Sequence, residues 1–340
     1  NEITDNIELS YNGGVQIPMM SWPVTVINNN PLDSNKLNIK LSENLVFNSE
    51  NVGISGYFII ESEYITFNGE DFNIEIKNIT NWSGLIENGL GDGTTPTKNS
   101  YTNIEINNLS MTSNNSTLKV NNGWLVQEYY GNNINNGEII INNCRGQGPT
   151  LKGVLIGSHL GDSMSLNGKI KIENCYTTSN IDNINDTGNL IGNDTGKEMS
   201  GGIIDILNCY STGNISTGGI LGNRTGTISS GGTINIENCY SNGVINNGGG
   251  ILGNDTCKNS VSGILNVKNC YSTGIKNFSS DGGIFGSQTK FQATGGTINI
   301  EKCYSTGDGG SGILGNKTGF NASNGIINLT NCFSIGNTSD

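Results

Sequence analysis

The sequence predicts an all-β protein folded as a single-stranded parallel β-helix, a right-handed solenoid with about 31 residues per coil. The first observation is a repeated block, GGTINIENCYSNG at 231–243. It recurs as GGIIDILNCYSTG (201–213), SGILNVKNCYSTG (262–274), GGTINIEKCYSTG (295–307) and NGIINLTNCFSIG (324–336), with earlier copies NGKIKIENCYTTS (167–179) and NGEIIINNCRGQG (136–148). A period near thirty residues is typical of stacked units that contact only their neighbours.

The second observation is the alternation of side chains inside each block. Ile234 and Ile236 precede Cys239 and alternate with the polar residues Asn235 and Glu237. This two-residue period predicts a half-buried strand in every copy. A glycine seven residues before the cysteine, such as Gly232, lets the chain turn into the strand.

We expect the cysteine position to form an apolar core column. Isoleucine or leucine replaces cysteine in the early copies FNIEIKNIT (72–80) and TNIEINNLS (102–110), so the position is buried. The predicted column comprises Ile79, Leu109, Cys144, Cys175, Cys209, Cys239, Cys270, Cys303 and Cys332. The absence of CxxC pairs and the single histidine argue against a metal site. Buried free thiols are favoured, and disulfides between coils stay open as an alternative. Cys257 lies outside the column and is expected to be an exposed thiol or a pairing partner.

The residue before the column position is almost always asparagine, with Lys302 as the exception. Asparagine tolerates a left-handed backbone at a bend, and stacked amides can hydrogen-bond from coil to coil. We therefore predict a structural ladder at a corner. Its members are Asn78, Asn108, Asn143, Asn174, Asn208, Asn238, Asn269 and Asn331.

Two further columns admit a functional interpretation. Asn-X-Thr follows the recurring ILG motif at Asn193, Asn223, Asn254 and Asn316, which are candidate glycosylation sites if the protein is secreted and otherwise a structural polar ladder. An aromatic residue follows most column cysteines: Tyr176, Tyr210, Tyr240, Tyr271, Tyr304 and Phe333. These rings either stack from coil to coil or form a stripe that binds sugars or a partner.

The chain divides into an N-terminal arm and cap (1–35) and a parallel β-helix (36–340), with nine recognisable repeats from about residue 72 onward. The arm covers the first coil or docks on a neighbouring subunit. After Cys332 little sequence is left to cover the last coil. An uncovered coil offers free strand edges and apolar surface to another chain.

Composition excludes several classes of partner. The net charge is −12 without a cluster of Lys or Arg, so we expect no nucleic-acid partner. No apolar run approaches the roughly 18 residues of a membrane span, so we expect no membrane insertion. Carboxylates in the outward column that contains Glu173, Glu237 and Glu301 alternate with other residue types, which is typical of a solvated face. His159 is expected to be an isolated surface residue. We therefore predict no catalytic residues, no cofactor and no metal, and the protein is not expected to be an enzyme.

The NCYSTG element, followed by GGILG, resembles the GLUG-like Asn/Gly-rich repeats of bacterial surface adhesins and of repeat proteins from large DNA viruses. The resemblance covers about residues 36–340 and implies an external structural or adhesive role. We accordingly expect a non-enzymatic extracellular, cell-surface or virion-surface structural protein. It would self-assemble as a homo-oligomer, fibre or surface layer through stacked β-helix ends or its N-terminal arm. The alternatives are an adhesin or carbohydrate-binding module that recognises surface glycans and, third, a polysaccharide-active enzyme.

Overall fold

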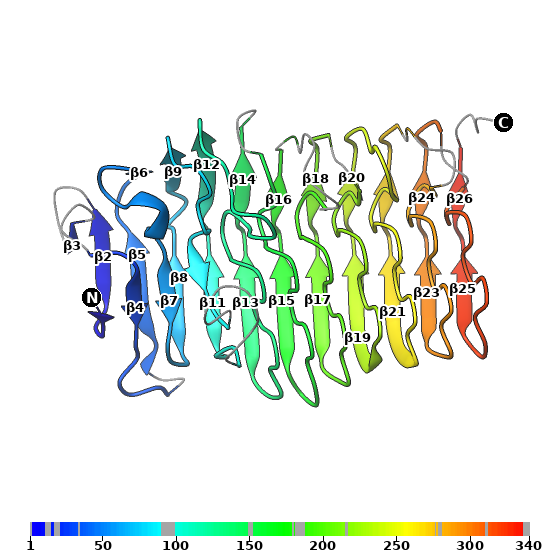
Figure 1. The fold of residues 1–340 in the computed structure, drawn as a ribbon, viewed down its shortest axis with the longest axis horizontal. Coiled ribbons are helices and arrows are strands. Elements are labelled where there is room, and N and C mark those ends of the chain that lie inside the picture. Colours follow the sequence, from blue (N-terminus) through cyan, green and yellow to red (C-terminus); the bar gives the residue numbers. More distant parts are fainter. Residues whose placement is uncertain are drawn as a thin grey trace.

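The chain forms an elongated parallel β-solenoid of about nine turns with about 31 residues per turn, which confirms the predicted fold class (Figure 1). The computed structural model describes residues 2–10, 15–16, 21–32, 35–89, 99–148, 152–178, 180, 188–214, 217–275, 277, 281–309 and 312–335. The coils stack along the long axis, from the first strands at the N-terminal end to β25 (Ile326–Thr330) and β26 (Phe333–Ser334) at the other end (Figure 1).

The long sheet is built from the alternating block that precedes each column position. Its twelve strands pair in parallel in the order β25-β23-β21-β19-β17-β15-β13-β11-β8-β5-β2-β3. Their bounds are β2 (Ile7–Ser10), β3 (Val15–Gln16), β5 (Leu37–Leu41), β8 (Ile65–Asn68), β11 (Ile104–Asn107), β13 (Glu138–Asn142), β15 (Lys169–Glu173), β17 (Ile203–Leu207), β19 (Ser230–Glu237), β21 (Ser262–Lys268) and β23 (Thr297–Glu301), followed by β25.

The short sheet follows the corner and carries the residues just after each cysteine. Its ten parallel strands run in the order β26-β24-β22-β20-β18-β16-β14-β12-β9-β6. Their bounds are β6 (Leu45–Asn48), β9 (Asn73–Lys77), β12 (Ser110–Asn114), β14 (Arg145–Gln147), β16 (Tyr176–Thr177), β18 (Tyr210–Ser211), β20 (Tyr240–Ser241), β22 (Tyr271–Ser272) and β24 (Tyr304–Ser305), followed by β26.

The third side closes each coil. It begins with a four-stranded parallel sheet of β1 (Glu2–Ile3), β4 (Val24–Val26), β7 (Phe58–Ile60) and β10 (Ile86–Glu87), and a short 3-10 helix (Gly53–Ser55) precedes β7. Single parallel bridges then continue this side through the ILG-type motifs, for example from Ile156 to Ile191 and from Leu221 to Leu252. The second sequence signature is therefore the third wall of the solenoid.

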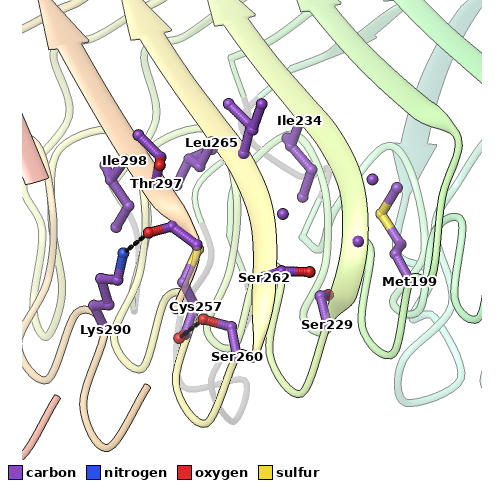
Figure 2. Close-up of a pocket in the computed structure, with 16 residues that line it drawn as sticks. Met199, Ser229, Ile234, Cys257, Ser260, Ser262, Leu265, Lys290, Thr297 and Ile298 are labelled. Carbon is purple, nitrogen blue, oxygen red and sulfur yellow. Dashed lines mark hydrogen bonds between the residues drawn. The ribbon is translucent and has the colours of Figure 1, made fainter. Parts of the chain in front are cut away.

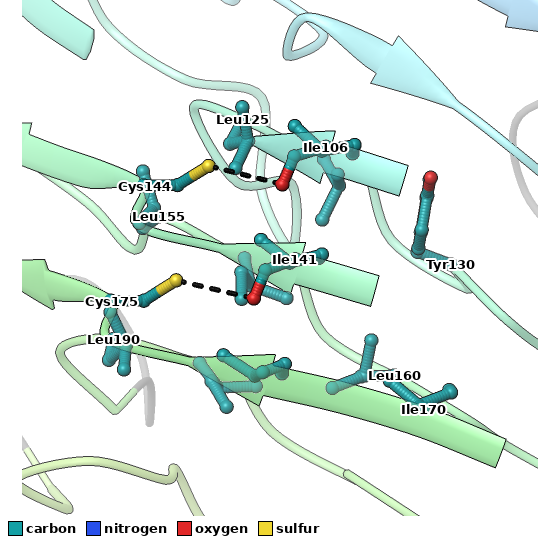
Figure 3. Close-up of a cluster of buried hydrophobic side chains, with 14 of the residues drawn as sticks. Ile106, Leu125, Tyr130, Ile141, Cys144, Leu155, Leu160, Ile170, Cys175 and Leu190 are labelled. Carbon is teal, nitrogen blue, oxygen red and sulfur yellow. Dashed lines mark hydrogen bonds between the residues drawn. The ribbon is translucent and has the colours of Figure 1, made fainter. Parts of the chain in front are cut away.

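The core is one continuous stack of inward side chains between these three walls. Ile206 of β17, Cys209 at the corner and Leu221 on the third side are all fully buried, and equivalent residues repeat in the neighbouring coils. Figure 3 shows Cys144 and Cys175 stacked in successive coils with leucines and isoleucines around them. Because each coil contacts only its neighbours, packing between coils holds the fold.

The glycine that ends CYSTG is required by close backbone contact. A Cβ atom at Gly274 would lie 1.9 Å from the carbonyl oxygen of Gly243, and one at Gly307 would lie 1.9 Å from that of Gly274. No side chain fits at such a distance, so the final glycine lets successive coils approach each other there.

The sequence interpretation is wrong about which wall residues 72–77 form. β9 (Asn73–Lys77) pairs with β12 of the short sheet, not with the long sheet. Consequently Phe72, whose carbonyl oxygen accepts from Ser110 N at 3.2 Å, lies beside Leu109 at the column position. Ile79 is buried one corner further on, where its N–H donates to Ser116 Oγ at 3.0 Å. A strand in the long sheet and a strand in the short sheet show the same alternation of apolar and polar residues in the sequence. Only the hydrogen-bond register tells which sheet a strand belongs to.

The described part of residues 1–35, which the sequence predicted to be an N-terminal arm and cap, contains strands that continue the parallel sheets. β2 pairs in parallel with β5, and β4 pairs in parallel with β7. The core side chains at this end are covered, with Leu9 and Val24 at most 1% exposed. The coils therefore begin well before residue 72. Trp22 also packs on Phe47 and Phe58 at this end.

Candidate functional site

The corner between the long and short sheets is made by asparagine in the left-handed conformation. Asn143, Asn208 and Asn238 have φ of 52°, 54° and 57°, and the other ladder positions, including Lys302, have similar values. The amides bond between coils: Asn238 Nδ2 donates to Asn208 Oδ1 at 3.1 Å, and Asn269 Nδ2 donates to Asn238 Oδ1 at 3.2 Å. Asn143 likewise donates to Asn108.

Some ladder positions have partners outside the ladder, and Asn174 and Asn78 are two of them. Asn174 Nδ2 donates to Asn142 Oδ1 at 3.0 Å, so its bond goes to the residue before the corner. Asn78 Oδ1 accepts from Asn115 Nδ2 at 3.0 Å, because β9 belongs to the short sheet. Both differences arise from local register, which the residue type alone does not reveal.

Replacing Asn238 by alanine should lower the free energy of unfolding by about 2–3 kcal/mol. A left-handed alanine costs about 1–2 kcal/mol, and each of the two lost amide bonds contributes about 0.5 kcal/mol, the low end of the usual range, because both are exposed to solvent. Asn238→Gly removes the same bonds without the backbone strain and should be less destabilising. Urea denaturation followed by circular dichroism measures both. Equal losses for the two variants would contradict a role for the left-handed backbone.

The column cysteines are free thiols that contact backbone carbonyls. All eight cysteines of the chain are unpaired. Cys144 Sγ donates to Ile106 O at 3.6 Å, and Cys175 Sγ donates to Ile141 O at 3.6 Å, each reaching the long sheet of the preceding coil (Figure 3). Burial raises the pKa of the Cys144 thiol well above its ordinary value, which keeps it protonated and unreactive. These thiols behave as small hydrophobes with a weak donor.

The tyrosine column is a stack of rings whose faces cover one another. Tyr210 and Tyr240 lie 4.9 Å apart with an interplanar angle of 3°, and the series continues through Tyr271 and Tyr304 to Phe333. Binding a sugar on an aromatic ring requires an exposed face. Within the stack only ring edges and hydroxyl groups remain available. The geometry therefore favours coil-to-coil stacking over a sugar-binding stripe.

The Asn-X-Thr column lies mostly inside the wall. Asn193 and Asn223 are 5% and 6% exposed, and Asn193 Oδ1 accepts from the backbone N–H of Asn223 at 2.8 Å. Asn223 Oδ1 accepts in the same way from Asn254 N. The threonines Thr195 and Thr225 are fully buried. A glycan on Asn193 or Asn223 would disrupt this ladder, whereas Asn254 is partly exposed and Asn316 is exposed.

His159 is not isolated, contrary to the sequence interpretation. Its ring stacks on Tyr129 at 4.3 Å, and its Nδ1 lies 3.1 Å from Asp162 Oδ2. Its Nε2 lies 3.8 Å from Asp194 Oδ2, and Arg224 holds that same oxygen at 2.8 Å. His159, Asp194 and Arg224 follow ILG-type motifs in successive coils, so the His159–Asp194 contact and the Arg224–Asp194 ion pair connect one coil to the next. In the sequence, His159, Asp194 and Arg224 can be recognised as a group because each lies two residues after the glycine of an ILG-type motif.

A buried lysine forms hydrogen bonds to the backbone in the last coils. Lys290 is 1% exposed, and its Nζ donates to Gly296 O and, at 3.1 Å, to Ile326 O of β25. Burial lowers its pKa from the ordinary value. Figure 2 shows Lys290 and Cys257 beside a cavity of about 20 Å³, room for roughly one water molecule. Cys257 is partly exposed and unpaired, so it is neither the fully exposed thiol nor the pairing partner that the sequence suggested. Burial raises the pKa of this thiol to about 12.

The last described coil exposes an inward side chain and two aromatic rings whose equivalents in the preceding coil are better covered. Leu329 of β25 is 47% exposed, whereas Ile300 at the same position one coil earlier is 1% exposed. Phe333 of β26 is 50% exposed and continues the aromatic stack, 5.2 Å from Tyr304. Phe320 is 53% exposed and stacks on Phe291. An exposed core side chain and two exposed aromatic rings therefore lie in the same coil, which contains β25 and β26.

A groove of about 1000 Å³ runs over the solvent face of the long sheet from β17 to β25. The middle of its floor is a second polar ladder, which the sequence interpretation missed. It consists of Asp205, Asn235, Asn266, Asn299 and Asn328. Its sequence signal is the residue four before each cysteine, which is asparagine in four consecutive copies.

Comparison of the chain with protein-family models, with curated proteins and with solved structures finds no match. Among the residues that the structure describes, no three or more His, Cys, Asp or Glu side chains are arranged to hold a metal ion. The described segments also include no helix of the length and apolarity needed to cross a membrane.

Proposed function

We propose that this protein is a non-enzymatic structural protein that assembles by stacking its last coil on another copy, forming a fibre or layer outside the cell or on a virion surface. The open last coil carries the proposal. Leu329 occupies an inward position yet is half exposed, and one further coil would cover it. Phe333 and Phe320 each end an aromatic stack that an incoming ring would extend.

The edge of this coil lacks the features that usually prevent strand addition. Edge strands of natural proteins are commonly protected by charged side chains or proline. β25 and β26 have neither, and Lys317 is the only charged residue between 309 and 335. The edge of β25 therefore presents no like charges to an incoming strand, although its Ile326 carbonyl already accepts from Lys290 Nζ.

The opposite end offers partners for this edge. Among the described strands, β1, β3 and β6 are the terminal members of the three walls at that end. The Asn51 side chain occupies part of the β6 edge, where its Nδ2 donates to Val46 O and its Oδ1 accepts from Asn48 N, each at 2.7 Å, so stacking there has to displace it. Head-to-tail stacking of the last coil on these strands would continue the parallel sheets. Each half-exposed apolar side chain that becomes buried contributes about 1 kcal/mol, and association itself opposes binding by about 4 kcal/mol or more. We therefore expect assembly at high protein concentration.

Sedimentation velocity and negative-stain electron microscopy test this proposal. The wild-type chain should form rods that lengthen with concentration, and Phe333→Lys should stay monomeric because it places a charge in the interface. Val261→Lys is the matched control, since Val261 is an exposed apolar residue on an inner coil. A wild-type protein that remains monomeric at high concentration contradicts the proposal. Dimers that grow no further would contradict a fibre and indicate pairing of two last coils.

A further inference from the structure

The groove on the long sheet has a continuous row of side-chain amides along its floor. Asn266 Nδ2 donates to Asn235 Oδ1, Asn299 Nδ2 to Asn266 Oδ1 and Asn328 Nδ2 to Asn299 Oδ1, each at 2.8 Å. Asn235 Nδ2 completes the row by donating to Asp205 Oδ1 at 2.7 Å. All four bonds point the same way, so the row is held in one orientation at the spacing of the strands, about 4.8 Å.

This arrangement leaves a regular set of hydrogen-bonding groups facing solvent. An asparagine amide has two N–H donors and two acceptor lone pairs. Asn235, Asn266 and Asn299 each use one donor and one lone pair within the row. Each therefore retains one donor and one acceptor for a ligand. A hydroxyl group also offers one donor and accepts in return, so a chain of hydroxyl groups matches the row.

The flanks of the row supply apolar and polar contacts side by side. On one side, β-branched residues stand in register on successive strands: Ile203, Thr233, Ile264, Thr297 and Ile326. The isoleucines of this series are exposed to solvent. On the other side lie Leu207, Glu237, Lys268, Glu301 and Thr330. A sugar ring has apolar C–H faces and polar hydroxyl edges, and this surface offers partners for both.

The charge of the groove selects the class of ligand. Asp205, Glu237 and Glu301 outnumber Lys268 among the lining residues, so the groove carries net negative charge. An anionic polymer such as a nucleic acid or a uronic-acid polysaccharide would be repelled. A neutral polymer has no such penalty, and the length of the row suits an extended chain better than a compact small molecule.

From the amide row, its flanks and its charge we infer that the solvent face of β17–β25 binds a neutral polysaccharide lying along the solenoid axis. The site is separate from the tyrosine stack, whose ring faces are covered. The groove lies on the side of the solenoid and shares only Leu329 with the residues that carry the assembly proposed above, since it includes neither Phe333 nor Phe320.

Affinity electrophoresis through gels containing soluble polysaccharides tests the inference. The probes are mixed-linkage β-glucan, xylan and galactomannan as neutral chains, with alginate and polygalacturonate as anionic ones. We expect at least one neutral polysaccharide to retard the protein. The double variant Asn235→Thr/Asn266→Thr should weaken that binding by about tenfold or more, since each lost hydrogen bond weakens binding about two- to tenfold. Threonine suits a strand, so the fold should persist.

The matched control is Asn246→Thr/Asn277→Thr, which removes an amide pair outside the groove, where Asn277 Nδ2 donates to Asn246 Oδ1 at 2.6 Å. It should bind like the wild type, and thermal denaturation should show both double variants folded. All proteins in this experiment carry Phe333→Lys, so that self-assembly does not change their mobility in the gel. The inference is overturned if no neutral polysaccharide retards the protein, if the groove variant binds unchanged, or if the anionic chains bind as strongly.

Discussion

Replacing Ile206 by alanine should lower the free energy of unfolding by about 2–5 kcal/mol. Ile206 is fully buried in the middle of β17, with Ile172 and Ile236 beside it in the adjacent coils. Truncation would leave a cavity that two stacked coils cannot close, because their backbones are joined by ladder hydrogen bonds. Urea denaturation followed by circular dichroism measures the loss as a lower midpoint.

The same strand provides the control. Ile203 of β17 is 40% exposed on the solvent face, and Ile203→Ala should change the free energy of unfolding by no more than about 0.5 kcal/mol. The two substitutions are chemically identical and three residues apart, so the difference between them reports the direction in which each side chain points. If both variants unfold at the same midpoint, the assigned inward face of β17 is wrong.

Trp124→Ala should be at least as damaging, with an expected loss of about 3–5 kcal/mol. Trp124 is fully buried, its ring lies 5.8 Å from that of Trp82, and its Nε1 donates to Lys152 O at 3.2 Å. Both rings are fully buried in the early coils, before the first column cysteine, Cys144. Truncation removes a large apolar area and leaves the Lys152 carbonyl without this donor.

Trp124→Phe separates these two contributions. Phenylalanine keeps most of the apolar contact and loses the N–H donor, so this variant should lose clearly less stability than Trp124→Ala. Thermal and urea denaturation of both variants give the comparison. A phenylalanine variant as unstable as the alanine variant would mean that the hydrogen bond to Lys152, and not packing against Trp82, holds this part of the core.

Much of the architecture could be predicted from the sequence because coil geometry is strictly periodic. The pair Ile234 and Ile236 in each repeat identified the inward face of the long sheet, and both residues are at most 4% exposed. The asparagine before the cysteine indicated a left-handed corner, and Asn238 has φ of 57°. These features depend on residue type and spacing, which the sequence contains in full.

Other features could not be derived in this way, and each depends on contacts between coils. Residues 72–77 alternate like a long-sheet strand, yet their hydrogen bonds place them in the short sheet. Asn193 matches a glycosylation motif, but its side chain is enclosed by the next coil. The tyrosines were recognisable as a column, whereas the covering of their faces follows from ring planes only 2–6° apart.

The sequence by itself determined the repeat length, the parallel solenoid and the inward columns, because these follow from a two-residue strand period and recurring glycine, asparagine and cysteine. Only the tertiary structure decided where the stack is open and where its surface can bind. Exposure of Leu329 depends on the lack of a neighbouring coil among the described residues, and the amide row through Asn266 depends on the register of five strands. Both are relations between coils, and a single repeat does not encode them.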